Sequence, residues 1–284
     1  MKYFLSCLTI SLFLTGCATT KISPEVRQKF NQTQAKIKTT PVATVVDSCL
    51  LRSELGTSHI AGQQSRQTAA KFTAELTTQL NEQGVQVTQQ LTPFICGYMP
   101  LEQLKKYDFK ANPDAKREEI TKYPVLNSDS VKLSELQNTA LLNLNQSLNA
   151  LSVKNIKNIQ QKQSAETQLD ISAADQAVLT DLLKTPYVFV VSTAGVDVSF
   201  GRSFVTSAVS LSLSMATLGA GAGVYPFLMP AEGQSYSLNL IDLNTKQVLW
   251  TKAGLLNKKV FSENKHSVAA PDILNPLFEI TTKK

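Results

Sequence analysis

The chain has 284 residues, of which 43% are hydrophobic and 18% are charged, and its formal net charge is +6. This composition is ordinary for a folded protein, and the length suits one large domain or one core domain with an insertion. The lysines are scattered and aromatic residues do not alternate with them, so the positive charge is not the footprint of a nucleic-acid-binding protein. Such a surface tolerates anionic lipid head groups or cell-wall polymers.

The first seventeen residues have the order of a bacterial secretion signal. Lys2 gives a positive start, an apolar run follows over 4–14, and Leu14-Thr15-Gly16-Cys17 ends it as a lipobox. We predict a signal peptide over 1–16 and a mature chain that begins at Cys17 and carries lipid there, as a palmitate-bearing lipoprotein. A cleaved signal without lipidation and a short membrane anchor remain alternatives, although the apolar run is too short to span about 30 Å of hydrocarbon.

The residue after the lipobox cysteine indicates the destination. Ala18 stands where an aspartate favours retention at the inner membrane. By resemblance to sorted lipoproteins, the protein is therefore expected at the outer membrane, lipid-anchored on the periplasmic face.

The four cysteines divide into two groups. Cys7 leaves with the signal and Cys17 is acylated, so the exported domain keeps only Cys49 and Cys96. An even pair in an oxidising compartment predicts a disulfide. Two buried free thiols remain the alternative, and no metal site is expected because two cysteines alone cannot complete a tetrahedral shell.

The mature chain divides into a lipidated tether over 17–40 and a single domain over 41–284. Ser23-Pro24-Glu25 is a good helix start within the tether, so a short helix is as plausible there as coil. The domain contains a region over about 100–170 that is rich in Asn, Gln, Lys and Leu. We predict that this region is a helical insertion without strands.

The domain is expected to begin with a strand, a helix and a second strand. β-Branched residues predict the first strand over 41–46, followed by a loop that holds Cys49 and His59. Apolar residues at helical spacing predict a helix over 65–83, and a strand follows from 84. If the two strands are parallel, both cysteines lie beyond the same edge of the sheet.

Leucines form a stripe inside the predicted insertion. Their steps of three and four residues are typical of a long amphipathic helix that packs against the sheet. A coiled-coil seam is the alternative. The stripe consists of Leu133, Leu136, Ala140, Leu141, Leu144, Leu148 and Leu151.

The remaining predicted elements are a helix, a central strand and a hairpin. Ser172-Ala173-Ala174-Asp175 is a helix-capping sequence that predicts a helix over 172–184. A strand is expected over 186–199, and its continuous apolar part over 187–191 is predicted to be buried on both faces. Alternation over 236–250, interrupted by a polar turn at 242–246, predicts a β-hairpin.

At this hairpin the chain resembles a group of bacterial envelope lipoproteins. The group is related to the curli secretion channel and to the lipoprotein activators of penicillin-binding proteins, and its core is similar to the amino-terminal domain of TolB. The matching residues are Asp242, Thr245 and Trp250, whereas Lys246 replaces the usual glycine. The resemblance implies an α/β fold in which helices flank a small mixed sheet that includes the late β-hairpin, whereas the helical insertion departs from the simplest members of the group. It carries over no functional residue.

Catalytic and cofactor signals are weak. Ser58, His59 and Glu54 are close in sequence, but sequence neighbours rarely form a triad, and His266 is distant. The run Gly219–Gly223 lacks the lysine and hydroxyl of a phosphate-binding loop and is interpreted as a flexible turn. We expect no enzyme activity, no cofactor and no metal.

The segment over 203–231 has no charged residue between Arg202 and Glu232. Its apolar residues fit either an alternating strand or one face of a helix, so periodicity does not decide between them. It is a candidate partner-facing or membrane-facing surface. The residues expected to form this surface are Phe204, Leu211, Leu213 and Met215.

These observations predict a non-enzymatic accessory or docking subunit of an envelope assembly. Its expected partner is an envelope protein or further copies of the same chain, and no nucleic acid is expected. The main alternative is an oligomeric secretion-pore lipoprotein, and a hydrolase is a lesser one.

Overall fold

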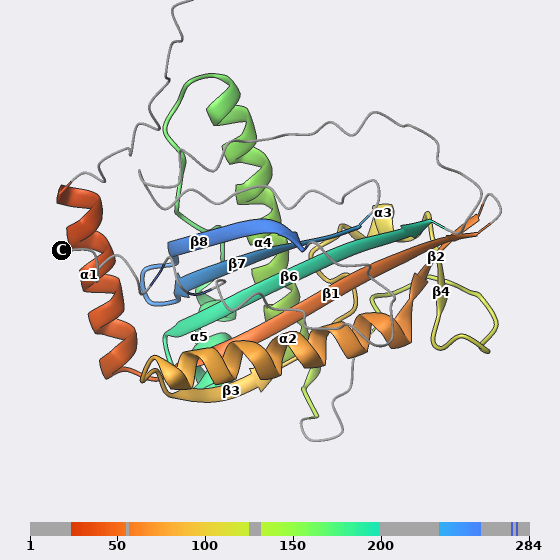
Figure 1. Ribbon diagram of the computed structural model, residues 1–284, viewed down its shortest axis with the longest axis horizontal. Coiled ribbons are helices and arrows are strands. Elements are labelled where there is room, and N and C mark those ends of the chain that lie inside the picture. The colour runs from red at the N-terminus through yellow and green to blue at the C-terminus, as the bar shows by residue number, and fades with distance from the viewer. Residues whose placement is uncertain are drawn as a thin grey trace, which may run out of the picture.

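The computed structural model describes residues 24–54, 57–124, 132–198 and 233–256, together with Leu274 and Leu277. Within them the chain forms an open, eight-stranded mixed sheet with helices on both faces, which confirms the α/β prediction (Figure 1). The strands are β1 (Val42–Glu54), β2 (Thr57–Ala61), β3 (Val87–Leu91), β4 (Asp108–Lys110), β5 (Glu118–Glu119), β6 (Tyr187–Val198), β7 (Gly233–Asp242) and β8 (Gln247–Leu256). The helices are α1 (Pro24–Thr39), α2 (Gly62–Glu82), α3 (Leu101–Leu104), α4 (Glu135–Gln160) and α5 (Ala173–Leu183).

The sheet is built around two long parallel strands. Its order is β5-β4-β2-β1-β6-β7-β8, and β3 pairs separately with β1. β1 and β6 pair from Val42↔Tyr187 to Ser53↔Val198. Because both are covered on two faces, β6 is a near-continuous apolar strand in the centre, as the sequence predicts.

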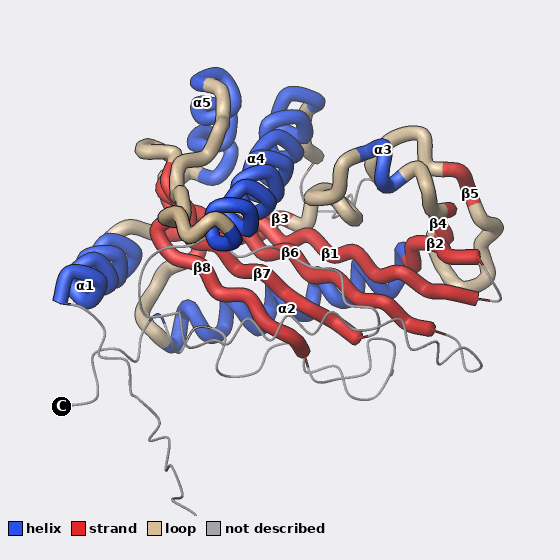
Figure 2. Tube along the Cα trace, turned by 90° about the horizontal axis from the view of Figure 1, so that it is seen from above, coloured by secondary structure: helices blue, strands red, loops and turns tan. Residues whose placement is uncertain are grey.

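Two helical layers cover the sheet. Figure 2 shows α2 on one side and α4 with α5 on the other, while α1 and α3 lie near opposite ends. On the α2 face, Phe72, Leu76 and Leu80 pack with alternate residues of β1, β6 and β7. On the opposite face, the leucine stripe of α4 packs with α5 and the other set of strand residues. The stripe is therefore sheet-covering core rather than a coiled-coil seam, with Leu136 as an exception at 72% exposure.

The helix expected as one possibility in the tether is present as α1. Ile37 at its end is fully buried in the α2-face core, and Phe30 packs against the same core. The side-chain amide of Gln34 donates a hydrogen bond to the carbonyl of Leu277, so α1 also contacts the carboxyl-terminal region of the chain.

The predicted helix caps and turn are confirmed in detail. Ser172 Oγ accepts a hydrogen bond from the amide of Asp175 at 2.9 Å and caps α5. Asp242 Oδ1 accepts from the amide of Asn244 at 3.0 Å in the β7–β8 turn. Lys246, which stands at the usual glycine position, has a φ of +54°, in the left-handed region that favours glycine.

Three predictions about local structure are wrong. β1 continues to Glu54, so Cys49 lies inside a strand, and His59 lies in β2 rather than in a loop. The region over 100–170 is not purely helical, because it contains β4 and β5. These short strands are stabilised by pairing, β2 with β1, β4 with β2 and β5 with β4, and not by a hydrophobic pattern of their own.

Candidate functional site

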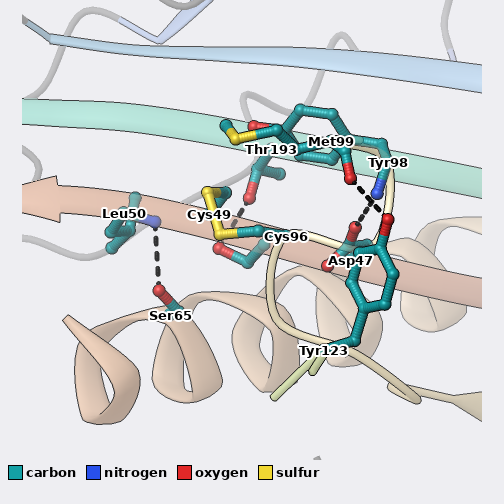
Figure 3. The surroundings of a disulfide bond; sticks show 10 residues. Asp47, Cys49, Leu50, Ser65, Cys96, Tyr98, Met99, Tyr123 and Thr193 are labelled. Atoms are coloured by element: carbon teal, nitrogen blue, oxygen red, sulfur yellow. Dashed lines mark hydrogen bonds between the residues drawn. A yellow bond between two sulfur atoms is a disulfide. The ribbon is translucent and has the colours of Figure 1, made fainter. Parts of the chain in front are cut away.

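The predicted disulfide is present and buried. Cys49 on β1 and Cys96, which follows β3, are joined with an S–S distance of 2.03 Å, and both are fully buried (Figure 3). The alternative of two free thiols is therefore wrong. The bond fixes the segment after β3 to β1, one of the two central strands of the sheet.

The disulfide is the centre of a distinct cluster at one end of the sheet, which we call the disulfide end. Alternation along β1 places Asp47, Cys49 and Leu51 on the face that carries α4. The disulfide end is defined by the buried residues Cys49, Leu51, Ile60, Ile95, Cys96, Tyr98, Met99, Leu104, Ile120 and Ala194.

Asp47 is a carboxylic acid enclosed within this end. Its Oδ2 accepts a hydrogen bond from the amide of Tyr98 at 2.9 Å, whereas Oδ1 has no hydrogen-bond partner among the described residues. Burial raises the pKa of Asp47 to about 7, although the amides of Tyr98, Gly97 and Cys96 act in the opposite direction. The amide of Tyr98 donates to this carboxyl, whereas the amide of Cys96 donates to the carbonyl of Ser48 at 3.3 Å.

The turn over 96–99 brings these amides together. The amide of Met99 donates to the carbonyl of Cys96 at 3.0 Å, and Cys96 has a φ of +61°. A Cβ on Gly97 would lie 2.9 Å from Cβ of Phe94, so the turn also needs glycine there for close packing. The disulfide and Asp47 thus hold a turn whose backbone is unfavourable for most residues.

Tyr123 connects this turn to α4. Its hydroxyl donates to the carbonyl of Met99 at 2.9 Å and accepts from the side-chain amide of Gln146 at 2.8 Å. Burial raises the pKa of Tyr123, and burial also raises the pKa of Tyr98 well above its ordinary value. Both phenols are therefore neutral, and Tyr123 acts as a hydrogen-bonded bridge between the two elements.

A pocket of about 330 Å³ opens beside the turn. Two phenols, two carboxamides, one ammonium group and two apolar side chains form its wall. The residues that line it are Tyr98, Met99, Pro100, Gln103, Lys106, Tyr107 and Asn149. This mixture of apolar surface with a few polar groups is typical of sites that bind small molecules or chain ends.

A second pocket, of about 250 Å³, lies at the start of α2. Its wall is formed by Arg52, His59, Ala61, Gln64, Lys110, Asn112 and Pro113. His59 is almost fully buried there. Ser58 is its neighbour on β2, and successive strand side chains point to opposite faces, so the two do not face each other as a nucleophile and base would.

Several predicted positions lie outside the described residues. These are Cys17, the proposed partner surface of Phe204, Leu211, Leu213 and Met215, and also His266 and Gly219–Gly223. In the part of the chain that the structure describes, no helix is long and apolar enough to cross a membrane. The same residues contain no group of three or more His, Cys, Asp or Glu side chains placed to hold a metal ion.

Comparison with known proteins gives no relative. No family model, no curated protein and no solved structure matches this chain. The resemblance at the β7–β8 hairpin to the curli-channel group therefore stays a prediction.

One residue of this site, Asp47, could have been identified from the sequence as a candidate buried acid. Asp47 follows the apolar run over 41–46, and a single acid at the end of such a run marks either the end of the strand or a buried carboxyl. The pocket itself has no such signal, because its wall combines three separate segments: the 98–100 turn, the α3 region and Asn149 on α4.

Proposed function

We propose that the protein is an outer-membrane lipoprotein whose α/β domain acts on the periplasmic side as a non-enzymatic accessory or docking subunit of an envelope assembly. The observation that carries the proposal is the disulfide between Cys49 and Cys96, because disulfides form and persist in oxidising compartments such as the periplasm. The lipobox that ends at Cys17 supports the same location independently.

The chemistry of the disulfide end favours recognition over catalysis. The wall of the 330 Å³ pocket offers carboxamides and an ammonium group, which hold a ligand by hydrogen bonds, and two tyrosine rings that add apolar surface. A nucleophile with an adjacent base is not among its lining residues. Because the disulfide and Asp47 fix the turn that forms one side, the pocket is preorganised, which lowers the entropic cost of binding.

One observation favours a secretion pore as the second candidate. β6 and β7 are antiparallel neighbours and remain paired up to Val196↔Gly233. The uncharged segment that holds Phe204, Leu211, Leu213 and Met215 therefore connects adjacent ends of two paired antiparallel strands. A membrane barrel is built from paired antiparallel strands.

The anchoring part of the proposal is tested by Cys17→Ser. Labelled palmitate should be incorporated into the parent chain and not into the variant, and the variant should no longer fractionate with outer membranes. Cys7→Ser is the matched control, because that cysteine leaves with the signal. Equal outer-membrane partitioning of parent and Cys17→Ser protein would contradict lipid anchoring.

The docking and pore functions are separated by crosslinking in intact cells and by conductance. A photoreactive residue at exposed Lys105, next to the pocket but outside its lining, should give a discrete adduct with an envelope partner, whereas one at exposed Lys71 on α2 should not. Crosslinked products at multiples of the protein's own mass, together with conductance of the full-length protein in planar bilayers, would support the pore instead.

A further inference from the structure

Three polar side chains that line the pocket beside α3 have no partner in the described part of the fold. Within the described residues, no hydrogen bond or ion pair engages the side chains of Gln103, Lys106 or Asn149. By contrast, Lys105 is the neighbour of Lys106 but lies outside the pocket, and it pairs with Glu102 at 2.8 Å. The lining contains no carboxylate, so no lining residue balances the positive charge of Lys106.

A buried amide one helical turn from the pocket-lining Asn149 is also without a hydrogen-bond partner among the described residues. Asn145 is 1% exposed, and neither its oxygen nor its nitrogen has a hydrogen-bond partner among the described residues. It lies one helical turn before Asn149, so the two carboxamides share one flank of α4. A buried amide with both atoms unsatisfied is costly in a folded protein and indicates a missing polar partner.

Much of the backbone of the turn beside this pocket already has hydrogen-bond partners, so recognition rests mainly on side chains. The amide of Tyr98 donates to Asp47, the amide of Met99 donates to Cys96, and the carbonyl of Met99 accepts from Tyr123. The carbonyl of Pro100 accepts from the amides of α3, and proline has no amide proton of its own. Gln103, Asn149 and Lys106 therefore supply the polar contacts.

We propose that this pocket binds the carboxyl terminus of a short peptide. Each carboxamide has a donor and an acceptor, as a peptide group has, so Gln103 and Asn149 can pair with the ligand's backbone. Lys106 matches the terminal carboxylate, and the tyrosines with Met99 form an apolar wall for a small side chain. The volume of about 330 Å³ admits a chain end but no folded segment. The inference deepens the proposed docking role, on which the choice of an envelope ligand rests.

The test uses the full-length lipidated protein in detergent and four probes. Two are acetylated dialanines with a free carboxylate, one of L- and one of D-configuration. The third is the L-dipeptide amide and the fourth is N-acetylmuramic acid, an anionic sugar. We expect a Kd of roughly 0.1–1 mM for at least one free dipeptide, as suits so small a ligand, and about tenfold weaker binding of the amide. Preference for the L-form indicates a protein carboxyl terminus as the source, and preference for the D-form indicates a cell-wall stem peptide.

Matched variants locate the site. Lys106→Gln should weaken binding of the free dipeptide about two- to fivefold, and the loss should shrink in high salt, because the charge is exposed. Lys105→Gln should leave binding unchanged, since that charge lies outside the pocket. Asn149→Ala should weaken the dipeptide and its amide alike, because it removes a contact to the backbone of the ligand.

Three outcomes would overturn the inference. The first is that neither free dipeptide binds at concentrations up to about 10 mM. The second is that the free L-dipeptide and its amide bind equally well. The third is that N-acetylmuramic acid binds more tightly than both free dipeptides. These outcomes leave the lipid-anchoring and crosslinking results untouched, so failure of the peptide site is distinguishable from failure of the docking role.

Discussion

Different interactions stabilise the two ends of the sheet. The hairpin end, where β6 begins and β7 turns into β8, has short connections closed by local hydrogen bonds, such as those that Asp242 and Ser172 accept. The disulfide end has a buried acid, a strained turn and a covalent bond between distant segments. At the hairpin end each local sequence specifies its own conformation. At the disulfide end the conformation depends on contacts across the fold.

This difference explains why the proposed binding pocket lies at the disulfide end. A pocket needs exposed polar groups and a fixed wall, which an aliphatic core provides poorly. At the disulfide end, the bond between Cys49 and Cys96 holds the turn beside the pocket, and Tyr123 ties that turn to α4. The disulfide end therefore contributes to stability through its buried groups and also forms one wall of the proposed binding pocket, and variants of pocket side chains such as Lys106 separate the two roles.

The largest expected effect comes from removing the disulfide. The Cys49→Ala/Cys96→Ala double variant should lose about 4 kcal/mol of free energy of unfolding, since the cross-linked cysteines are 47 residues apart and the bond restricts the unfolded chain. Urea unfolding with and without reductant measures the loss. The parent should shift with reductant and the double variant should not. A parent that is insensitive to full reduction would show that the bond contributes nothing to stability.

The next effect is the pH dependence caused by Asp47. Its pKa in the folded protein, about 7, lies above its ordinary value of 3.8, so the folded state keeps a proton that the unfolded state releases. The free energy of unfolding should therefore fall as pH rises from about 4 to about 7, by no more than about 4 kcal/mol, and level off above that.

Asp47→Asn tests this dependence. The variant carries no titrating group at 47 and keeps an oxygen to accept the hydrogen bond from Tyr98, so its stability should change less between pH 5 and pH 8. Urea unfolding at both pH values gives the comparison. Asp181→Asn, at an exposed position, should retain the parent's profile. A parent profile that is already flat over this range would refute the role given to Asp47.

A smaller effect distinguishes core from surface on α4. Leu144 is fully buried between α4 and the sheet, whereas Leu136 is 72% exposed in the same predicted stripe. Leu144→Ala should cost about 3 kcal/mol through lost burial and a residual cavity, and Leu136→Ala should cost less than about 0.5 kcal/mol. Thermal or urea unfolding of the two variants checks the difference. Similar losses in both would mean that Leu136 is covered in the protein in solution.

The hairpin end is also the part of the molecule that the sequence predicts best. The α5 helix, the central β6 strand and the β7–β8 turn are confirmed because each rests on local signals, namely a helix cap, a continuous apolar run and short polar turn residues. The disulfide pairing was predictable for another reason, since the predicted signal peptide and lipidation site account for the other two cysteines.

The disulfide end was predictable only in part. β2, β4 and β5 gain their conformation from strands that pair with them, and their own sequences have no strong strand pattern. The wall of the pocket combines the 98–100 turn, the α3 region and Asn149, and single-sequence reasoning has no means to bring these together. Asp47 was visible as an acid after an apolar run, but its burial follows from the turn that closes over it.

The smallest expected effect concerns two left-handed residues, one at each end of the sheet. Lys184 caps α5 at the hairpin end with a φ of +57°, and Cys96 has a φ of +61° at the disulfide end. Lys184→Gly should raise the free energy of unfolding by roughly 0.5–1 kcal/mol, because glycine adopts this conformation without a steric cost. The lost ion pair with Asp181 is solvent-exposed and contributes little.

Lys184→Ala is the control, since alanine keeps the steric cost and should give no gain. Cys96 allows no such relief, because its side chain forms the disulfide. A loss of stability in Lys184→Gly would show that Lys184 stabilises the hairpin end through contacts beyond its backbone.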